Sequence, residues 1–370
     1  MQEETNWILC HSTRATRRRR SYFMSIAPSP LYKRIATEEA FATPDLLDEY
    51  RKLLASGSVN DPGFESLVGY YLLSESDRPT QVRNRLIDLD ERRIADMNAT
   101  GIDQQVLALT SPGVQIFDAD TARALAISTN DQLAEAIARH PGRFSGLAAI
   151  APQDPAAAVK ELERGVRQLG LKGAIVNSHT RGEYLDNKKF WPIFEAAEAL
   201  DVAIYLHPNT PSAAMVAPLL ECGLDGAIYG FAVETGMHIL RIITSGAFDR
   251  FPKLQIVVGH LGEAIPFWLS RVDYFHRGIV ASKRCECMQP LKQKPSDYFK
   301  QNFYVTTSGM ASELPIMFVR SVMGADRLLY AMDYPYQFEP EEVILSDGLP
   351  ITGIEKKMFF QTNAEKVFHL

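Results

Sequence analysis

The chain has 370 residues, of which 46% are hydrophobic and 23% charged, and its formal net charge is −6. These values are typical of a soluble globular protein, and they exclude a disordered, collagen-like or disulfide-stapled chain. The length fits two ordinary domains, or one α/β barrel of about 250 residues with insertions.

A basic segment opens the chain. Residues 1–33 hold six basic side chains against two acidic ones, and removing their charge of +4 leaves −10 for the remainder. An acidic body argues against nonspecific nucleic-acid binding, which depends on neutralising phosphates. The run Arg17 to Arg20 is compatible with a targeting segment or a nucleic-acid arm. Because this run lies outside any periodic segment and Met24 follows it as an alternative start, we interpret residues 1–33 as a disordered leader or an overextended start.

Membrane spans and disulfides are not expected. No stretch reaches the roughly 18 to 20 consecutive apolar residues that a membrane span needs, so no membrane partner is predicted. The four cysteines are Cys10, Cys222, Cys285 and Cys287. The pair Cys285-x-Cys287 lacks the second half of a structural zinc site. We expect free thiols in a reducing cytoplasm.

Short β-branched apolar runs alternate with helical segments from residue 34 onward, a pattern typical of βα units and a parallel sheet. Eight such runs occur, at 34–39, 105–110, 144–150, 173–177, 203–208, 254–260, 303–308 and 328–333. They predict an α/β fold, a closed (β/α)₈ TIM-type barrel, as one domain over residues 34–370.

The connection after the first strand is unusual. Helical periodicity is present at 46–56, 156–169 and 190–200, but residues 57–79 are rich in Gly, Ser, Pro and Asp. Long connections inside a compact domain are usually functional. We therefore predict that residues 57–79 are an inserted lid over the barrel mouth.

Polar side chains stand at the carboxyl ends of several predicted strands, where barrel active sites lie. They are Glu38 and Glu39 on the first strand, His207 on the fifth, His260 on the sixth, Thr307 and Ser308 on the seventh and Asp333 on the eighth. Carboxylates and imidazoles from different strands are ligands that bind Mn²⁺ or Zn²⁺ and leave positions open for substrate. The sequence therefore predicts a metal site.

Each of these residues has a structural alternative. His207 before Pro208 fits a hydrogen-bonded core residue, and Asp333 fits a cap of the following segment. Three such residues at three strand ends together favour the metal site. His238, within a helical stretch, is expected to pack rather than to ligate. No dinucleotide-binding, P-loop or nucleophile-elbow motif is present.

Six segments of the chain resemble the amidohydrolase superfamily, and within it the metal-dependent nonoxidative decarboxylases. They are RIATEEAFATP, ALTSPGVQ, IYLHP, GFAVETGMHILRIITSGAFDRFPKLQIVVGHLGEAIPFWLSR, YAMDYPYQ and FFQTNAEKVFHL, and the resemblance spans about residues 34–370. It implies a carboxy-lyase that acts on a carboxylated phenol in the catabolism of lignin-derived aromatic compounds.

The resemblance also implies a ligand set. Glu38, His207 and Asp333 would bind a divalent metal, and Ala40 leaves one fewer protein ligand than a histidine there would, which favours Mn²⁺ over Zn²⁺. Asp333 would be both ligand and proton donor, with His260 assisting beside the substrate. No organic cofactor is needed, because the dearomatised ring is its own electron sink.

Four more residues are implied in binding a small aromatic acid. Arg78 in the lid and Arg271 would contact a substrate carboxylate, while Phe231 and Tyr336 would line an aromatic pocket near the interface of a homodimer or dimer-based oligomer. Two alternatives stay open. A metal-dependent hydrolase would use Asp333 to activate water against an ester, lactone or amide, and a catalytically silent binding protein would hold no metal.

Overall fold

The computed structural model describes residues 31–370, and Tyr32–Leu370 form one compact unit. Residues 1–30 of the predicted leader lie outside the described residues. At its end, the Tyr32 ring stacks on Phe360 with 5.2 Å between centroids, and the backbone N–H of Lys33 donates to Gln361 Oε1 at 3.0 Å. Tyr32 and Lys33 therefore pack with the barrel unit.

The strands all pair in parallel. They are β1 (Ile35–Phe41), β2 (Gln104–Leu109), β3 (Phe144–Gly146), β4 (Ala148–Ala149), β5 (Gly173–Asn177), β6 (Ala203–His207), β7 (Ile256–Val258), β8 (Phe303–Thr306) and β9 (Leu328–Leu329). Segments β3 and β4 belong to one predicted run, interrupted at Leu147, whose N–H donates to Leu107 O at 2.9 Å. Between the first and last strands, Thr37 N–H donates to Tyr330 O at 3.0 Å. The eight predicted runs thus form the expected α/β barrel.

Two strands are shorter than the sequence predicts. The runs 254–260 and 328–333 contain β7 and β9, which end at Val258 and Leu329. Beyond them His260 and Asp333 adopt left-handed backbone conformations, with φ of 50° and 70°. A left-handed residue cannot continue a strand, so the chain turns where these polar side chains stand.

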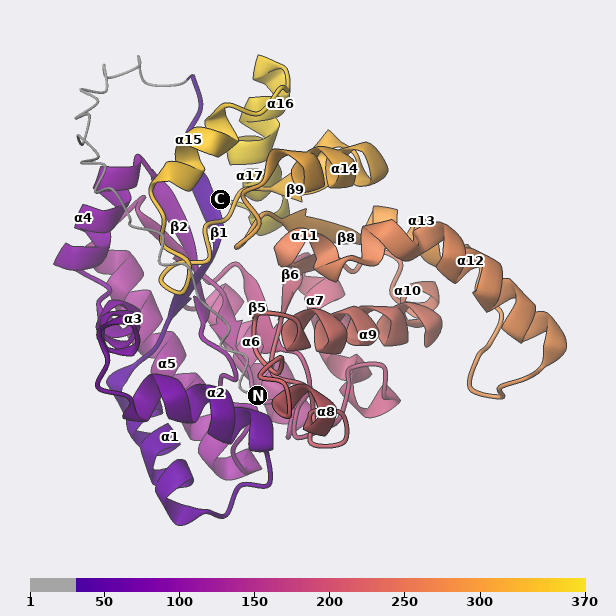
Figure 1. The fold of residues 1–370 in the computed structure, drawn as a ribbon, viewed down its shortest axis with the longest axis horizontal. Coiled ribbons are helices and arrows are strands. Elements are labelled where there is room, and N and C mark those ends of the chain that lie inside the picture. The colour runs from indigo at the N-terminus through magenta and orange to yellow at the C-terminus, as the bar shows by residue number, and fades with distance from the viewer. Residues whose placement is uncertain (1–30) are drawn as a thin grey trace, which may run out of the picture. The chain divides into compact units, whose positions relative to one another are not determined.

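Helices surround the strands, and α12 extends outward from the rest of the described unit (Figure 1). The α-helices are α1 (Pro44–Ser56), α2 (Pro62–Leu73), α3 (Asp77–Ile87), α4 (Glu91–Thr100), α5 (Ala119–Arg139), α6 (Pro155–Arg167), α7 (Trp191–Leu200), α8 (Ala217–Leu220), α9 (Gly230–Thr244), α10 (Ala247–Arg250), α11 (His260–Glu263), α12 (Ile265–Ser282), α13 (Pro295–Asn302), α14 (Glu313–Met323), α15 (Glu341–Asp347), α16 (Gly353–Lys357) and α17 (Asn363–Phe368). Short helical segments add η1 (Lys188–Phe190), η2 (Ala325–Arg327) and η3 (Met358–Thr362).

The lid segment is helical, which corrects the expectation of an irregular stretch at 57–79. Asp61 caps α2 by accepting the N–H of Phe64 at 2.9 Å, and Pro62 follows at the first helical position. An aspartate cap followed by proline is a helix start signal. The same Asp and Pro residues that suggested a loop therefore begin α2.

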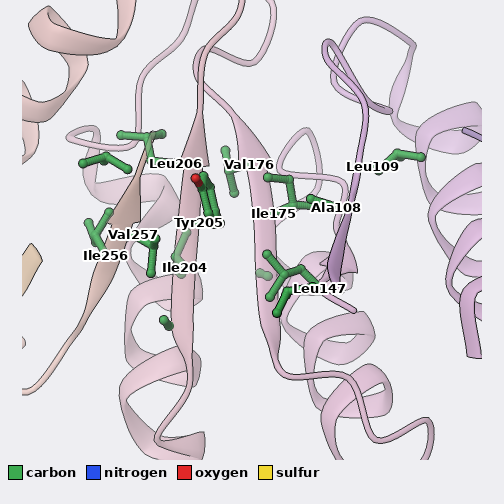
Figure 2. Close-up of a cluster of buried hydrophobic side chains, with 14 of the residues drawn as sticks. Ala108, Leu109, Leu147, Ile175, Val176, Ile204, Tyr205, Leu206, Ile256 and Val257 are labelled. Atoms are coloured by element: carbon green, nitrogen blue, oxygen red, sulfur yellow. The ribbon is translucent and has the colours of Figure 1, made fainter. Parts of the chain in front are cut away.

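The barrel strands bury apolar side chains on both faces, as parallel sheets do. Figure 2 shows such a cluster, in which Ile175 and Val176 of β5 lie beside Tyr205 and Leu206 of β6. All four are 2% exposed or less. This core holds the strand ends at fixed positions.

A buried polar network lies beneath α9. His238 is fully buried, which confirms that it packs inside the fold. The N–H of Leu185 donates to His238 Nε2 at 2.9 Å, so Nδ1 carries the proton and donates to Ser178 Oγ at 3.2 Å. Ser178 and Tyr184 then donate to the two carboxylate oxygens of Glu234 at 3.0 and 3.1 Å. Burial lowers the pKa of His238 to about 3.

This shift predicts acid sensitivity. Between about pH 6.5 and pH 3 the unfolded chain binds a proton at His238 and the folded chain does not, so stability falls as the pH falls, by about 1.4 kcal/mol per pH unit. In His238→Gln the unfolding free energy should change less steeply with pH than in the parent, by up to about 1.4 kcal/mol per pH unit. Urea denaturation at pH 6, 5 and 4 measures it, and equal slopes for the variant and the parent would contradict the prediction.

Cysteine pairing differs in part from expectation. Cys285 and Cys287, in the segment after α12, form a disulfide, so the expectation of free thiols is wrong for this pair. Cys222 is free and exposed, and Cys10 lies outside the described residues. Among the described residues, no helix is both long enough and apolar enough to cross a membrane.

Candidate active site

Glu38 is the central side chain at the barrel mouth. It follows a shift in the β1–β2 register between Ala36 and Glu39 and is 3% exposed. Its Oε2 accepts hydrogen bonds from the hydroxyls of Tyr205 and Thr306, the latter at 2.9 Å. Its Oε1 is buried and has no hydrogen-bond partner among the described residues. A buried carboxylate oxygen without a donor is an available ligand atom.

Two histidines face this oxygen. His207 Nε2 lies 3.3 Å and His260 Nε2 lies 3.6 Å from Glu38 Oε1. The opposite ring nitrogens are held in place, because His207 Nδ1 is 2.8 Å from Pro208 O and His260 Nδ1 is 2.7 Å from Glu263 Oε1. An imidazole fixed through Nδ1 presents Nε2, which is the usual arrangement of a metal-binding histidine.

Asp333 completes the cluster. Ligand atoms of Glu38, His260 and Asp333 lie within 4.8 Å of one another. Carboxylate oxygens and imidazole nitrogens at this spacing suit a divalent cation such as Mn²⁺. The sequence analysis placed His260 beside the substrate and not among the ligands. In the structure, the Nε2 atoms of His260 and His207 both lie beside Glu38 Oε1, so each is an available ligand atom.

The carboxyl groups have opposite pKa shifts. Burial would raise the pKa of Glu38, but the adjacent His260 and His207 lower it to about 2. Burial raises the pKa of Asp333 to about 7 although His260 opposes the shift. Burial would lower the pKa of His260, but Glu263 and Glu38 raise it to about 10. The imidazoles thus hold Glu38 ionised by their positive charge, and a divalent cation would supply charge of the same sign.

A cavity of about 160 Å³ opens beside the cluster. His207, His260 and Asp333 line it together with side chains of the lid segment. The lid residues are Leu67, Val68, Tyr71 and Leu72, and the flanking helices α1 and α3 add Leu47, Tyr50 and Leu86. The lid therefore covers the cluster, as the sequence predicted for this segment.

Three of the four predicted substrate-binding residues line this cavity. They are Arg78, Phe231 and Tyr336. An Arg78 N–H donates to Tyr336 O at 2.9 Å, and the Tyr336 hydroxyl is 2.6 Å from Thr110 Oγ1. Arg78 reaches the cavity from α3, at the end of the lid.

Arg271 is not among the residues that line the cavity. It lies on α12, is exposed, and its guanidinium stands 4.7 Å from the Phe275 ring centroid. The expected contact between Arg271 and a substrate carboxylate is therefore not supported by its position in this chain. Helix α12 extends outward from the rest of the described unit (Figure 1), which accounts for the difference.

Sequence reasoning missed Tyr205, Thr306 and Glu263. Tyr205 precedes His207 by two residues, so alternation along the strand places both on one face. Glu263 follows His260 by three residues, which is close enough for a local contact. Thr306 gave no signal of its own, because its contact with Glu38 spans 268 positions.

The fold and cluster agree with comparisons to known proteins. Residues 80–370 match the family model described as Amidohydrolase. The chain belongs to the amidohydrolase family. It is 35% identical over 346 residues to the gamma-resorcylate decarboxylase of Polaromonas sp., covering 91% of this chain and 98% of that relative.

Solved structures place it in the decarboxylase branch of the family. The 5-carboxyvanillate decarboxylase of Novosphingobium aromaticivorans, complexed with manganese and 4-hydroxy-3-methoxy-5-nitrobenzoic acid, is 54% identical, with a TM-score of 0.90 and coverage of 92% and 96% of the two chains. The 5-carboxyvanillate decarboxylase of Sphingomonas paucimobilis is 39% identical, with a TM-score of 0.86 and coverage of 91% and 99%.

Gly259 tests the geometry of this cluster. An added Cβ would stand 2.5 Å from Glu38 Oε2 and 2.9 Å from Oε1, so Gly259→Ala must displace the carboxylate. We expect Mn²⁺ affinity to fall about tenfold or more, measured by isothermal titration calorimetry. Gly278→Ala, where nothing lies within 4 Å of the new Cβ, is the matched control. Parental Mn²⁺ affinity in Gly259→Ala would refute the assigned role of Glu38.

Proposed function

We propose that this chain is a metal-dependent decarboxylase that converts 5-carboxyvanillate, or a closely similar carboxylated phenol, to the phenol and CO₂. One observation carries the proposal: the same cavity is lined by residues of the cation-binding cluster and by an arginine and aromatic rings. A flat dianionic or trianionic aromatic acid matches both sides. The relative solved with manganese and a nitro-substituted hydroxymethoxybenzoic acid supports the same substrate class.

Glu38, His207 and Asp333 are the proposed metal ligands, and His260 Nε2, which lies 3.6 Å from Glu38 Oε1, stays free of the cation and donates a hydrogen bond. The two carboxylates favour Mn²⁺, while Zn²⁺ is compatible with the imidazoles. When bound, the cation supplies positive charge that holds the phenolate and carboxylate oxygens of the substrate.

Asp333 is the proposed proton donor. It stands on the cavity wall beside His260, which Glu263 holds in one orientation. A proton from Asp333 forms a C–H bond at the ring carbon that carries the carboxylate. The C–C bond to that carboxylate then breaks, its electron pair returns to the ring, CO₂ leaves and aromaticity is restored. His260 donates a hydrogen bond to the reacting group during this transfer.

Arg78 is the proposed partner of the second substrate carboxylate. Its hydrogen bond to Tyr336 O fixes the guanidinium at the cavity, and a guanidinium has five N–H groups arranged to pair with a carboxylate. Phe231 and Tyr336 contact the faces and edges of the ring. The apolar lid excludes water, which strengthens these charge interactions.

A homodimer completes the proposal. Exposed apolar side chains gather on α12 and α14, where Phe267, Trp268 and Phe318 are 67%, 46% and 42% exposed. Phe267 also lies close to Phe318, with 6.3 Å between ring centroids. A large exposed apolar patch is typical of an association surface. The proposal includes a cytoplasmic location, and it includes a role in breaking down lignin-derived aromatic acids, which agrees with the methoxylated phenolic substrate class.

The reaction itself can be measured directly. The Mn²⁺-loaded protein should release one CO₂ for each 5-carboxyvanillate consumed, and in D₂O the vacated ring carbon should acquire deuterium. Esters, lactones and amides of similar aromatic acids serve as the comparison set. Cleavage of that set without release of CO₂ from 5-carboxyvanillate would establish the hydrolase alternative instead.

Asp333→Asn separates proton donation from metal binding. The variant keeps an oxygen ligand of nearly the same shape but has no carboxylic proton, so turnover should fall by about 10² or more at saturating Mn²⁺. Substrate affinity, followed by titration, should change little. Asp120→Asn, on exposed α5 surface, is the control. If Asp333→Asn turns over near the parental rate, Asp333 is not the proton donor, and His260 becomes the candidate.

A further inference from the structure

The residue that carries the proposed proton donor has an unusual backbone. Asp333 has a φ of 70°, in the left-handed region that residues other than glycine rarely adopt. Such conformations are unfavourable and persist only when the surrounding structure holds them. Something in the fold must therefore fix this segment.

The backbone N–H groups on both sides of Asp333 donate to a single carboxylate. Met332 N–H donates to Glu39 Oε1 at 2.9 Å, and Tyr334 N–H donates to Glu39 Oε2 at 3.2 Å. One planar group thus spans the two peptide units that flank the left-handed residue. Ala40 N–H adds a third link to the same segment by donating to Tyr334 O at 2.7 Å.

We propose that Glu39 is the positioning residue for Asp333: its carboxylate holds the left-handed turn after β9 and thereby sets where the Asp333 side chain enters the metal cluster. The proposal rests on the proposed function in so far as Asp333 is taken as metal ligand and proton donor. The mechanism above assigns Glu39 no contact with the metal or the substrate.

Strand β1 links the two halves of the site. Glu38 and Glu39 are consecutive, and both are buried, at 3% and 0% exposed. Because successive side chains of a strand point to opposite sides, Glu38 turns toward His260 and Asp333, and Glu39 turns toward the segment after β9. The pair lies within β1, where the pairing with β2 shifts register between Ala36 and Glu39. A displacement of β1 would therefore move Glu38 and Asp333 together.

A buried arginine supports the same arrangement. Arg93 of α4 is fully buried, donates to Ala40 O at 2.5 Å and lies 4.5 Å from the centroid of the Tyr334 ring. Arg93 thus lies beside the same segment whose Met332 and Tyr334 N–H groups donate to Glu39. The donors that position the turn are thus the same groups that stabilise the buried carboxylate.

Glu39→Gln is the direct test. Glutamine keeps the volume and one acceptor, but its NH₂ group faces a backbone N–H, so one of the two links to the turn is lost. We expect Mn²⁺ affinity, measured by calorimetric titration, to fall tenfold or more. Glu161→Gln is the matched control. Glu161 of α6 is also buried, at 8% exposed, and its carboxylate accepts a hydrogen bond from Asn130 Nδ2 at 2.7 Å. The control variant should retain parental Mn²⁺ affinity.

Hydrogen exchange gives a second readout that does not depend on the metal or on activity. In the metal-free protein, a peptide covering residues 330–338 should exchange at least tenfold faster in Glu39→Gln than in the parent or in Glu161→Gln. Glu39→Asp, which keeps the charge but is one methylene too short to span both amides, should behave like Glu39→Gln. Parental exchange and parental Mn²⁺ affinity in Glu39→Gln would overturn the proposal. Absence of Mn²⁺ binding by the parent protein would instead count against the proposed function.

Discussion

The burial of two carboxyl groups at one barrel mouth is the constraint on which this structure depends. Ligand atoms of Glu38 and Asp333 lie within 4.8 Å, together with His260. Charges this close in a poorly solvated place need compensating charge and fixed geometry. The imidazoles and a divalent cation provide the charge. Tyr205, Thr306 and the strand ends provide the geometry.

The lid determines how strongly that charge acts. Its helices place leucine, valine and tyrosine side chains over the cavity. Arg83 joins the end of α2 to the start of α3 by donating to Tyr71 O, Ser74 O and Thr80 Oγ1. A lid made of two linked helices excludes water more uniformly than a mobile loop would, so charge interactions beneath it are weakly screened.

Much of this arrangement could be predicted from the sequence, because strand periodicity and strand-end polarity are local signals. The eight apolar runs gave the barrel, and their ends gave Glu38, His207 and Asp333. The helical lid was missed, since Asp61 and Pro62 are common both in loops and at helix starts. Some contacts join residues far apart in the chain, so no local pattern predicts them. They are the hydrogen bond of Thr306 to Glu38 and those of the Met332 and Tyr334 N–H groups to Glu39. Arg271 was placed by resemblance alone, and its position on outward-extending α12 could not be derived from the sequence.

The closure of β1 on the segment after β9 has a consequence for how the protein folds. Glu39 and Met332 are 293 positions apart, as are Thr37 and Tyr330. Contacts of such separation carry a large loop-closure entropy and form slowly, because nearly the whole chain must be in place before they are made. On this ground we expect the cation-binding cluster to assemble late in folding. A cation bound only by the folded chain then draws partly folded molecules toward completion by mass action, in proportion to its concentration relative to its dissociation constant.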